Sequence, residues 1–155
     1  MADFSSNHGQ ILLALKNLAQ DLQPEGLDDT EVEIRRSWLF NGEPFQGISV
    51  CPAGEQYDDG TVGTQDVGYL NTITFVKFRA GDAILDSDKD LQWYELIRRR
   101  LCDQRLQVTI TNDTAPSEHV CIVSQGRDLT NERKWPNYQV RQLPVAVWLR
   151  ELPTA

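Results

Sequence analysis

The stretch of the sequence closest to a metal-binding motif is Asp86-Ser87-Asp88-Lys89-Asp90. Its D-x-D-x-D spacing is that of the first ligands in an EF-hand calcium loop. Such a loop also needs glycine at its sixth position and a bidentate glutamate at its twelfth. This chain has Leu91 and Ile97 at those positions. The sequence therefore predicts no calcium site, and we expect the acids at 86–88 to cap the start of a helix instead.

The histidines and cysteines of the chain do not form a recognisable catalytic or metal-binding motif. His8 stands near an expected helix start and should be exposed, and His119 comes two residues before Cys121. In a strand, His119 and Cys121 would share one face. A nucleophile pair, however, needs hydrogen-bond contact and an orienting third group. Cys51 and Cys102 are also isolated, which disfavours a zinc site or a disulfide framework and favours buried free thiols.

Phosphate-binding and hydrolase motifs are absent from the sequence as well. Gly60, Gly63 and Gly68 do not have the G-x-G-x-x-G spacing and stand next to acids. The chain has no G-x-x-x-x-G-K-[ST], no H-E-x-x-H and no G-x-S-x-G. We therefore predict a protein that is not an enzyme and that uses no cofactor and no metal.

Charge is unevenly distributed along the chain. It has 23 acidic and 15 basic residues, a net charge of −8, which disfavours nucleic-acid binding. Residues 37–76 contain five acids and no Lys or Arg, whereas residues 91–105 contain four arginines and two acids. Two solvated surfaces of different sign explain this pattern simply. Complementary patches that join subunits head to tail are the alternative.

Two helices are predicted, and strands fill most of the rest. Apolar residues at helical spacing indicate a first helix over about 6–22, with Ser5, Ser6 or Asn7 as its N-cap. A second helix is expected over about 88–104, with arginines toward its C-terminal end. Its predicted buried stripe consists of Leu91, Tyr94, Ile97 and Leu101. Strands are expected at 31–35, 48–51, 69–78, 106–110, 119–123 and 138–149.

Two prolines and one tryptophan give more specific expectations. Pro52 should end the second strand, so that residues 53–68 form a long acidic, Gly-rich loop or a protruding hairpin. Pro144 predicts that the last strand lies at a sheet edge or is bulged there. Trp148 faces away from the apolar row of that strand, so it covers either a packed helix or a subunit interface.

Several strands follow one another without helical crossovers. We therefore predict one α+β domain over residues 1–155, with a mostly antiparallel sheet and two main helices packed on it. No apolar run approaches the roughly 20 residues that span a bilayer. The candidates for a subunit interface or a ring lumen are Asp58, Asp59, Asp66, Arg98, Arg99, Arg100 and Trp148.

The order of these segments resembles a known family. A helix ILLALKNLAQDL leads to the strands EVEIRRSW and GISVCPAGE, a Gly/Asp-rich loop, the strand GYLNTITFVKF, a helix with ELIRRRL and the strand VRQLPVAVWLRE. This layout resembles the tail terminator (tail completion) and neck proteins of long-tailed bacteriophages. The resemblance covers most of the chain in element order and includes no signature motif. Residues 125–134 have no counterpart in it.

The resemblance implies a structural subunit of a virion, assembled in the host cytoplasm. In that family a ring, expected to be a hexamer, forms at the head-proximal end of the tail tube and ends tube polymerisation. Its partners would be copies of itself, the tail tube protein and the head completion or connector protein. DNA would pass through the lumen without specific binding, and no membrane would be involved. A neck connector or stopper is an alternative, and a small ligand-binding domain or enzyme using His119 is an alternative of another class.

Overall fold

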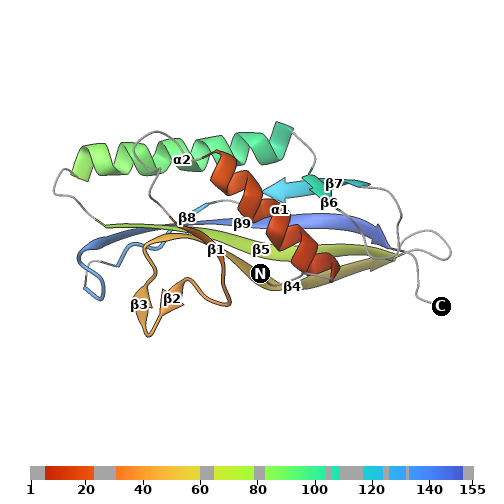
Figure 1. Ribbon diagram of the computed structural model, residues 1–155, viewed down its shortest axis with the longest axis horizontal. Coiled ribbons are helices and arrows are strands. Elements are labelled where there is room, and N and C mark those ends of the chain that lie inside the picture. The colour runs from red at the N-terminus through yellow and green to blue at the C-terminus, as the bar shows by residue number, and fades with distance from the viewer. Residues whose placement is uncertain are drawn as a thin grey trace.

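A long, mixed β-sheet carries two helices on one face and a small hairpin on the other (Figure 1). The computed structural model describes residues 6–22, 31–59, 65–78, 83–103, 106–108, 117–123, 126–131 and 133–151. The elements are α1 (Asn7–Asp21), β1 (Val32–Ile34), β2 (Leu39–Phe40), β3 (Glu43–Pro44), β4 (Gly47–Asp59), β5 (Gln65–Phe78), α2 (Ala83–Asp103), β6 (Leu106–Val108), β7 (Ser117–Val123), β8 (Arg127–Asp128) and β9 (Tyr138–Glu151).

The seven-stranded sheet has the order β1-β4-β5-β9-β7-β6, with β8 also paired to β9. Every pair in it is antiparallel except β1–β4, which is parallel. The predicted mostly antiparallel α+β architecture is thus confirmed, with one parallel pair added. The long strands β5 and β9 pair over their whole length and form the middle of the sheet. Among the described residues, no helix is long and apolar enough to cross a membrane.

Helix α1 forms where its apolar stripe predicts. Of the three proposed N-caps, Ser6 serves, since its Oγ accepts a hydrogen bond from the N–H of Gly9 at 3.0 Å. Ile11, Leu15 and Ala19 are completely buried on the inner side of the helix. The stripe therefore faces the sheet, and the helix adds to the same core as α2.

Helix α2 begins earlier than expected and is rotated relative to the predicted stripe. It starts at Ala83, so the acids at 86–88 lie within the helix, and the prediction that they cap it was wrong. Leu91 is 42% exposed, whereas Trp93 is only 1% exposed and stacks on Phe75 with ring centroids 4.9 Å apart. Ile97 and Leu101 are buried as predicted, and Tyr94 is partly buried.

The core lies between the helices and the inner face of β4, β5 and β9. Inward and outward residues alternate along β9, as the period of two predicted. The sheet residues of the core include Ile48, Val50, Val67, Tyr69, Ile73, Phe75, Leu143, Val145, Val147 and Leu149.

The segment after Pro52 is a hairpin. The prediction that Pro52 ends the strand was wrong, because β4 continues through it to Asp59, with a register shift between Pro52 and Gly54. Of the two alternatives for residues 53–68, the described parts, 53–59 and 65–68, pair as antiparallel strands. The hairpin alternative is confirmed for those parts, and residues 60–64 lie outside the described ranges.

Pro144 is tolerated inside the sheet for a local reason. Both predicted alternatives were wrong: β9 is not at an edge, since it has β5 on one side and β7 and β8 on the other, and its register with β5 runs through Pro144 without a bulge. The C=O of Val140 points to the β8 side, where it accepts from the N–H of Leu129 at 2.9 Å. Alternation along the strand then points the nitrogen of Pro144 to that side. The described pairings on that side stop at Gln142 and resume at Val145, so no described residue stands opposite Pro144 there.

Candidate assembly surfaces

The hairpin of β4 and β5 carries the acidic part of the chain. β1 pairs with β4 only as far as Val50, and residues 52–58 are all exposed. We call residues 52–59 of β4 and 65–70 of β5 the β4–β5 arm. In Figure 1 this arm runs with β9 to the end of the sheet that lies farthest from β2 and β3. An exposed acidic strand at the sheet edge is therefore a candidate contact surface.

A row of charges crosses the arm on the face away from the helices. Asp58, Asp66 and Arg150 are register partners on β4, β5 and β9. Arg150 binds Asp66 through two hydrogen bonds, of 2.9 and 3.4 Å. This hydrogen bonding lowers the pKa of Asp66 and raises that of Arg150. Within the described residues Asp58 has no ion-pair partner, so the row keeps an unbalanced negative charge at the edge.

Trp148 lies on the same face, directly across from Gly68. A Cβ at Gly68 would lie 2.7 Å from two carbons of the Trp148 indole, so only glycine leaves room for the ring. Trp148 is half-buried, and the described helices cover the opposite face of the sheet. The prediction that Trp148 covers a packed helix is therefore wrong for α1 and α2. A role in a subunit interface stays a prediction.

The basic surface lies in the helical layer. Arg98, Arg99 and Arg100 are all exposed on α2, as their sequence pattern indicates. Val67 lies in the core with the buried residues of α2, so its neighbour Asp66 points to the other side of the sheet. The structure thus brings Asp58, Asp66 and Trp148 to one face and places the arginines beyond the other. The side chain of Asp59 is outside the described set.

A polar cluster that the sequence did not predict joins the start of α1 to the sheet. His8 is half-buried, so its expected exposure was wrong, and its Nε2 lies 2.7 Å from Oδ1 of Asn71. The O–H of Tyr69 donates to Glu151, and Nδ2 of Asn7 donates to the same carboxylate at 2.7 Å. Burial and this hydrogen bond raise the pKa of Tyr69. The sequence feature that could have indicated this cluster is Asn71, a polar residue among the inward-facing apolar residues of β5.

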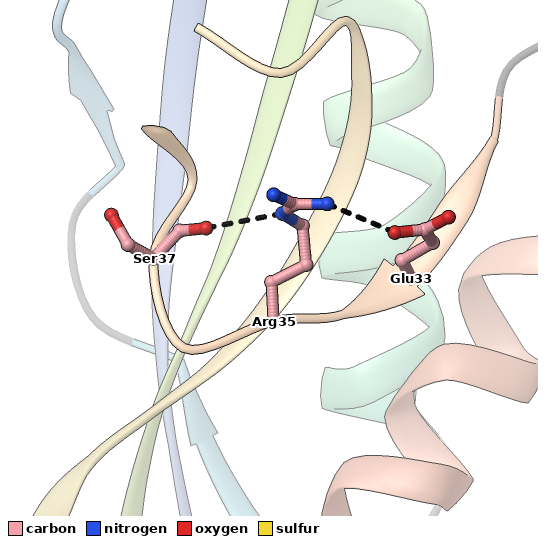
Figure 2. Close-up of polar contacts among 3 residues, drawn as sticks. All are labelled: Glu33, Arg35 and Ser37. Carbon is pink, nitrogen blue, oxygen red and sulfur yellow. Dashed lines mark hydrogen bonds and ion pairs between the residues drawn. The ribbon is translucent and has the colours of Figure 1, made fainter. Parts of the chain in front are cut away.

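Arg35 organises the segment between β1 and β2. Its Nη1 lies 3.0 Å from a carboxylate oxygen of Glu33, and its Nε donates to the C=O of Ser37 at 3.2 Å (Figure 2). The guanidinium also lies over the ring of Phe45, 4.2 Å from its centroid. Three kinds of contact therefore fix Arg35, and its role here is structural.

Aromatic contacts hold the β2–β3 hairpin in place. Trp38 meets Trp135 edge-on at 5.2 Å, and the indole N–H of Trp135 donates to the C=O of Gly42 at 3.4 Å. Phe40 is 59% exposed beside the turn. The hairpin is thus anchored to the segment before β9, on the face of the sheet away from the helices (Figure 1).

The residues weighed for catalysis or metal binding have side chains that lie mostly outside the described part of the chain. Among the described residues, no group of three or more His, Cys, Asp or Glu side chains could hold a metal ion. His119 and Cys121 lie in β7, but their side chains, like that of Cys102, are outside the described part of the chain. The expected buried free thiol is confirmed at Cys51.

The thiol of Cys51 is expected to react slowly with iodoacetamide in the folded protein. Cys51 is 5% exposed, and burial raises the pKa of its thiol to about 11. Since the thiolate is the reacting form, little of it is present near neutral pH. With Cys102 and Cys121 replaced by serine, mass spectrometry should find labelling more than about tenfold slower than in urea-unfolded protein. Equal rates in both states would contradict the buried position.

Comparison of the sequence with models of known protein families and with curated proteins finds no match in either.

Proposed function

We propose that this protein is a structural subunit of a bacteriophage virion. It forms a ring at the head-proximal end of the tail tube, ends tube polymerisation and docks the neck. The proposal is supported by the resemblance in element order and by the position of the charged surfaces. The observation that carries it is the separation of Asp58 and Asp66 of the β4–β5 arm from the arginines of α2, on opposite sides of one sheet.

This separation favours head-to-tail contacts between subunits. Two different patches on one chain make a heterologous interface, which closes into a ring when the rotation between subunits allows it. Asp58 has no ion-pair partner within the described residues, and Arg98 and Arg99 are exposed. Opposite charges on the two patches would guide the approach of subunits and fix their register. The ring is of six subunits by analogy with the phage family.

The experiment is the oligomeric state of the purified protein, alone and mixed with tail tubes. Mass photometry should find rings at low salt and fewer of them at about 1 M salt, where charges are screened beyond about 3 Å. Arg99→Glu should weaken assembly by about tenfold or more, because it places like charges together. Arg133→Glu is the matched control, since Arg133 is also exposed but lies in the segment before β9.

A charge swap tests the pairing itself. If the arm meets α2 of the next subunit, adding Asp58→Arg to Arg99→Glu should restore part of the assembly. Protein that stays monomeric in every condition, together with tails of normal length in phage lacking the gene, would overturn the proposal. Particles without the protein also separate the alternatives: over-long tails indicate a terminator, and leaking filled heads indicate a neck stopper.

A further inference from the structure

The outer edge of β4 has a stretch of backbone without a neighbouring strand. β1 covers this edge only over 48–50, where the N–H of Ile48 donates to the C=O of Glu31 at 2.7 Å and the C=O of Val50 accepts from Arg35 at 3.0 Å. Beyond Val50, no described residue pairs with β4 on that side. As far as the described residues show, the edge is therefore open over the rest of the strand.

The register identifies which residues present their backbone outward. Ile48 and Val50 point out, so Pro52 does too, because the direction alternates along a strand. The register shift between Pro52 and Gly54 adds one residue to β4 and reverses the alternation. Glu55 and Tyr57 therefore direct their N–H and C=O groups away from β5.

The side chains around this edge select among strands that could add to it. Residues 52–58 are exposed without interruption, and Tyr57, 64% exposed, donates a hydrogen bond to Glu55 at 2.5 Å. Acids on an open edge oppose its pairing with a copy of itself. Glu55 and Asp58 would face like charges in such a pair, whereas a basic strand would meet opposite ones. The charge pattern thus disfavours a second copy and favours a cationic partner.

We propose that residues 55–59 of β4 accept an extended, basic segment of a partner protein as an added strand. Backbone hydrogen bonds to Glu55 and Tyr57 supply the register, as in other cases of strand addition to a sheet edge. Lys or Arg side chains of the segment pair with Glu55 and Asp58 on the two faces, and an aliphatic stem covers the ring of Tyr57. This binding goes beyond the proposed ring and does not rest on it.

The test measures binding of a labelled peptide by fluorescence anisotropy. The probe has about eight residues, the length of an ordinary strand, and repeats Lys-Lys-Val-Val, so that each face of the added strand carries Lys. A peptide with Glu in place of Lys, and one with N-methylated alternate amides, are its controls. The Lys–Val peptide should bind, more weakly as salt rises, and the two controls should not. Equal binding of the N-methylated peptide would overturn strand addition.

Tyr57→Pro provides the decisive variant. It removes an outward N–H, and an edge strand tolerates proline at such a position, so the melting temperature should stay close to that of the wild type. Peptide affinity should fall by about tenfold or more, since a backbone bond is lost and the ring blocks the approach. Tyr57→Val, which keeps the N–H, is the matched control for the lost aromatic side chain.

Hydrogen exchange on the wild type gives a readout that needs no variant. Peptide addition should slow exchange of the Glu55 and Tyr57 amides, which have no bond to β5, and leave the already paired Gln56 amide unchanged. Three results would overturn the proposal: no slowing at these amides, unchanged affinity in Tyr57→Pro, or a dimer of this chain that Tyr57→Pro abolishes, which would make a second copy the occupant.

Discussion

Replacing Trp93 by alanine is expected to lower the free energy of unfolding by about 3–5 kcal/mol. Trp93 is 1% exposed and is the largest fully buried side chain among the described residues. Its ring stacks on Phe75 at 4.9 Å with an interplanar angle of 22°, so the change also removes an aromatic pair between α2 and β5. Urea denaturation, analysed with a common slope for all variants, gives the measurement.

Leu91→Ala is the matched control in the same helix. Leu91 is 42% exposed, so its truncation should cost less than about 1 kcal/mol. Trp93→Phe should cost much less than Trp93→Ala, because the buried indole N–H has no hydrogen-bond partner among the described residues and phenylalanine keeps the stack. Equal costs for Leu91→Ala and Trp93→Ala would mean that the predicted stripe, and not the one in the structure, faces the core.

The two stripes of α2 show why periodicity alone could not orient the helix. The predicted stripe and the observed one share Ile97 and Leu101 and differ near the middle of the helix, where either Leu91 or Trp93 can face inward. Helical spacing fits both choices. Trp93 faces inward because it can stack there on Phe75 of β5. The position of Phe75 depends on tertiary contacts that one sequence does not reveal.

Pro52 and Pro144 show that local sequence rules are likewise insufficient to place strands. A proline lacks one N–H, and the sequence rule assumes that the sheet needs it. At Pro52 the missing group points to the open edge of β4, and at Pro144 it points between the pairings of β8 and β7. Both strands therefore continue through their prolines, and no described residue stands opposite either missing N–H. Where a backbone group points depends on register, so these two predictions failed while the strands themselves were predicted.

The candidate surfaces were predictable as charges but not as contacts. The exposure of Asp58 and of Arg99 follows from the charge pattern, and both are exposed. The pair of Asp66 with Arg150 joins strands far apart in the sequence. The contact of His8 with Asn71 arises only when α1 lies over β5. Such pairings require the fold first, and neither partner has a local pattern that indicates the other.

Replacing Gly47 by alanine is expected to cost about 3 kcal/mol or more in the free energy of unfolding. Gly47 has φ of +144°, a conformation that side chains rarely adopt, and a Cβ there would lie 2.5 Å from the C=O oxygen of Glu31. This oxygen cannot easily move, because it accepts the 2.7 Å hydrogen bond from Ile48 that begins the β1–β4 pairing. Strain and overlap therefore add at one residue.

Gly54→Ala separates the two causes. Gly54 also has a positive φ, of +127°, but nothing lies within 4 Å of a Cβ built there, so its substitution should cost only the backbone strain of about 1–3 kcal/mol. Urea denaturation should rank Gly47→Ala as the more damaging change. Hydrogen exchange should show faster opening at the Ile48 amide in that variant alone, because the overlap acts on its acceptor. Equal costs and an unchanged Ile48 amide would mean that β1 does not pack against Gly47 as the structure has it.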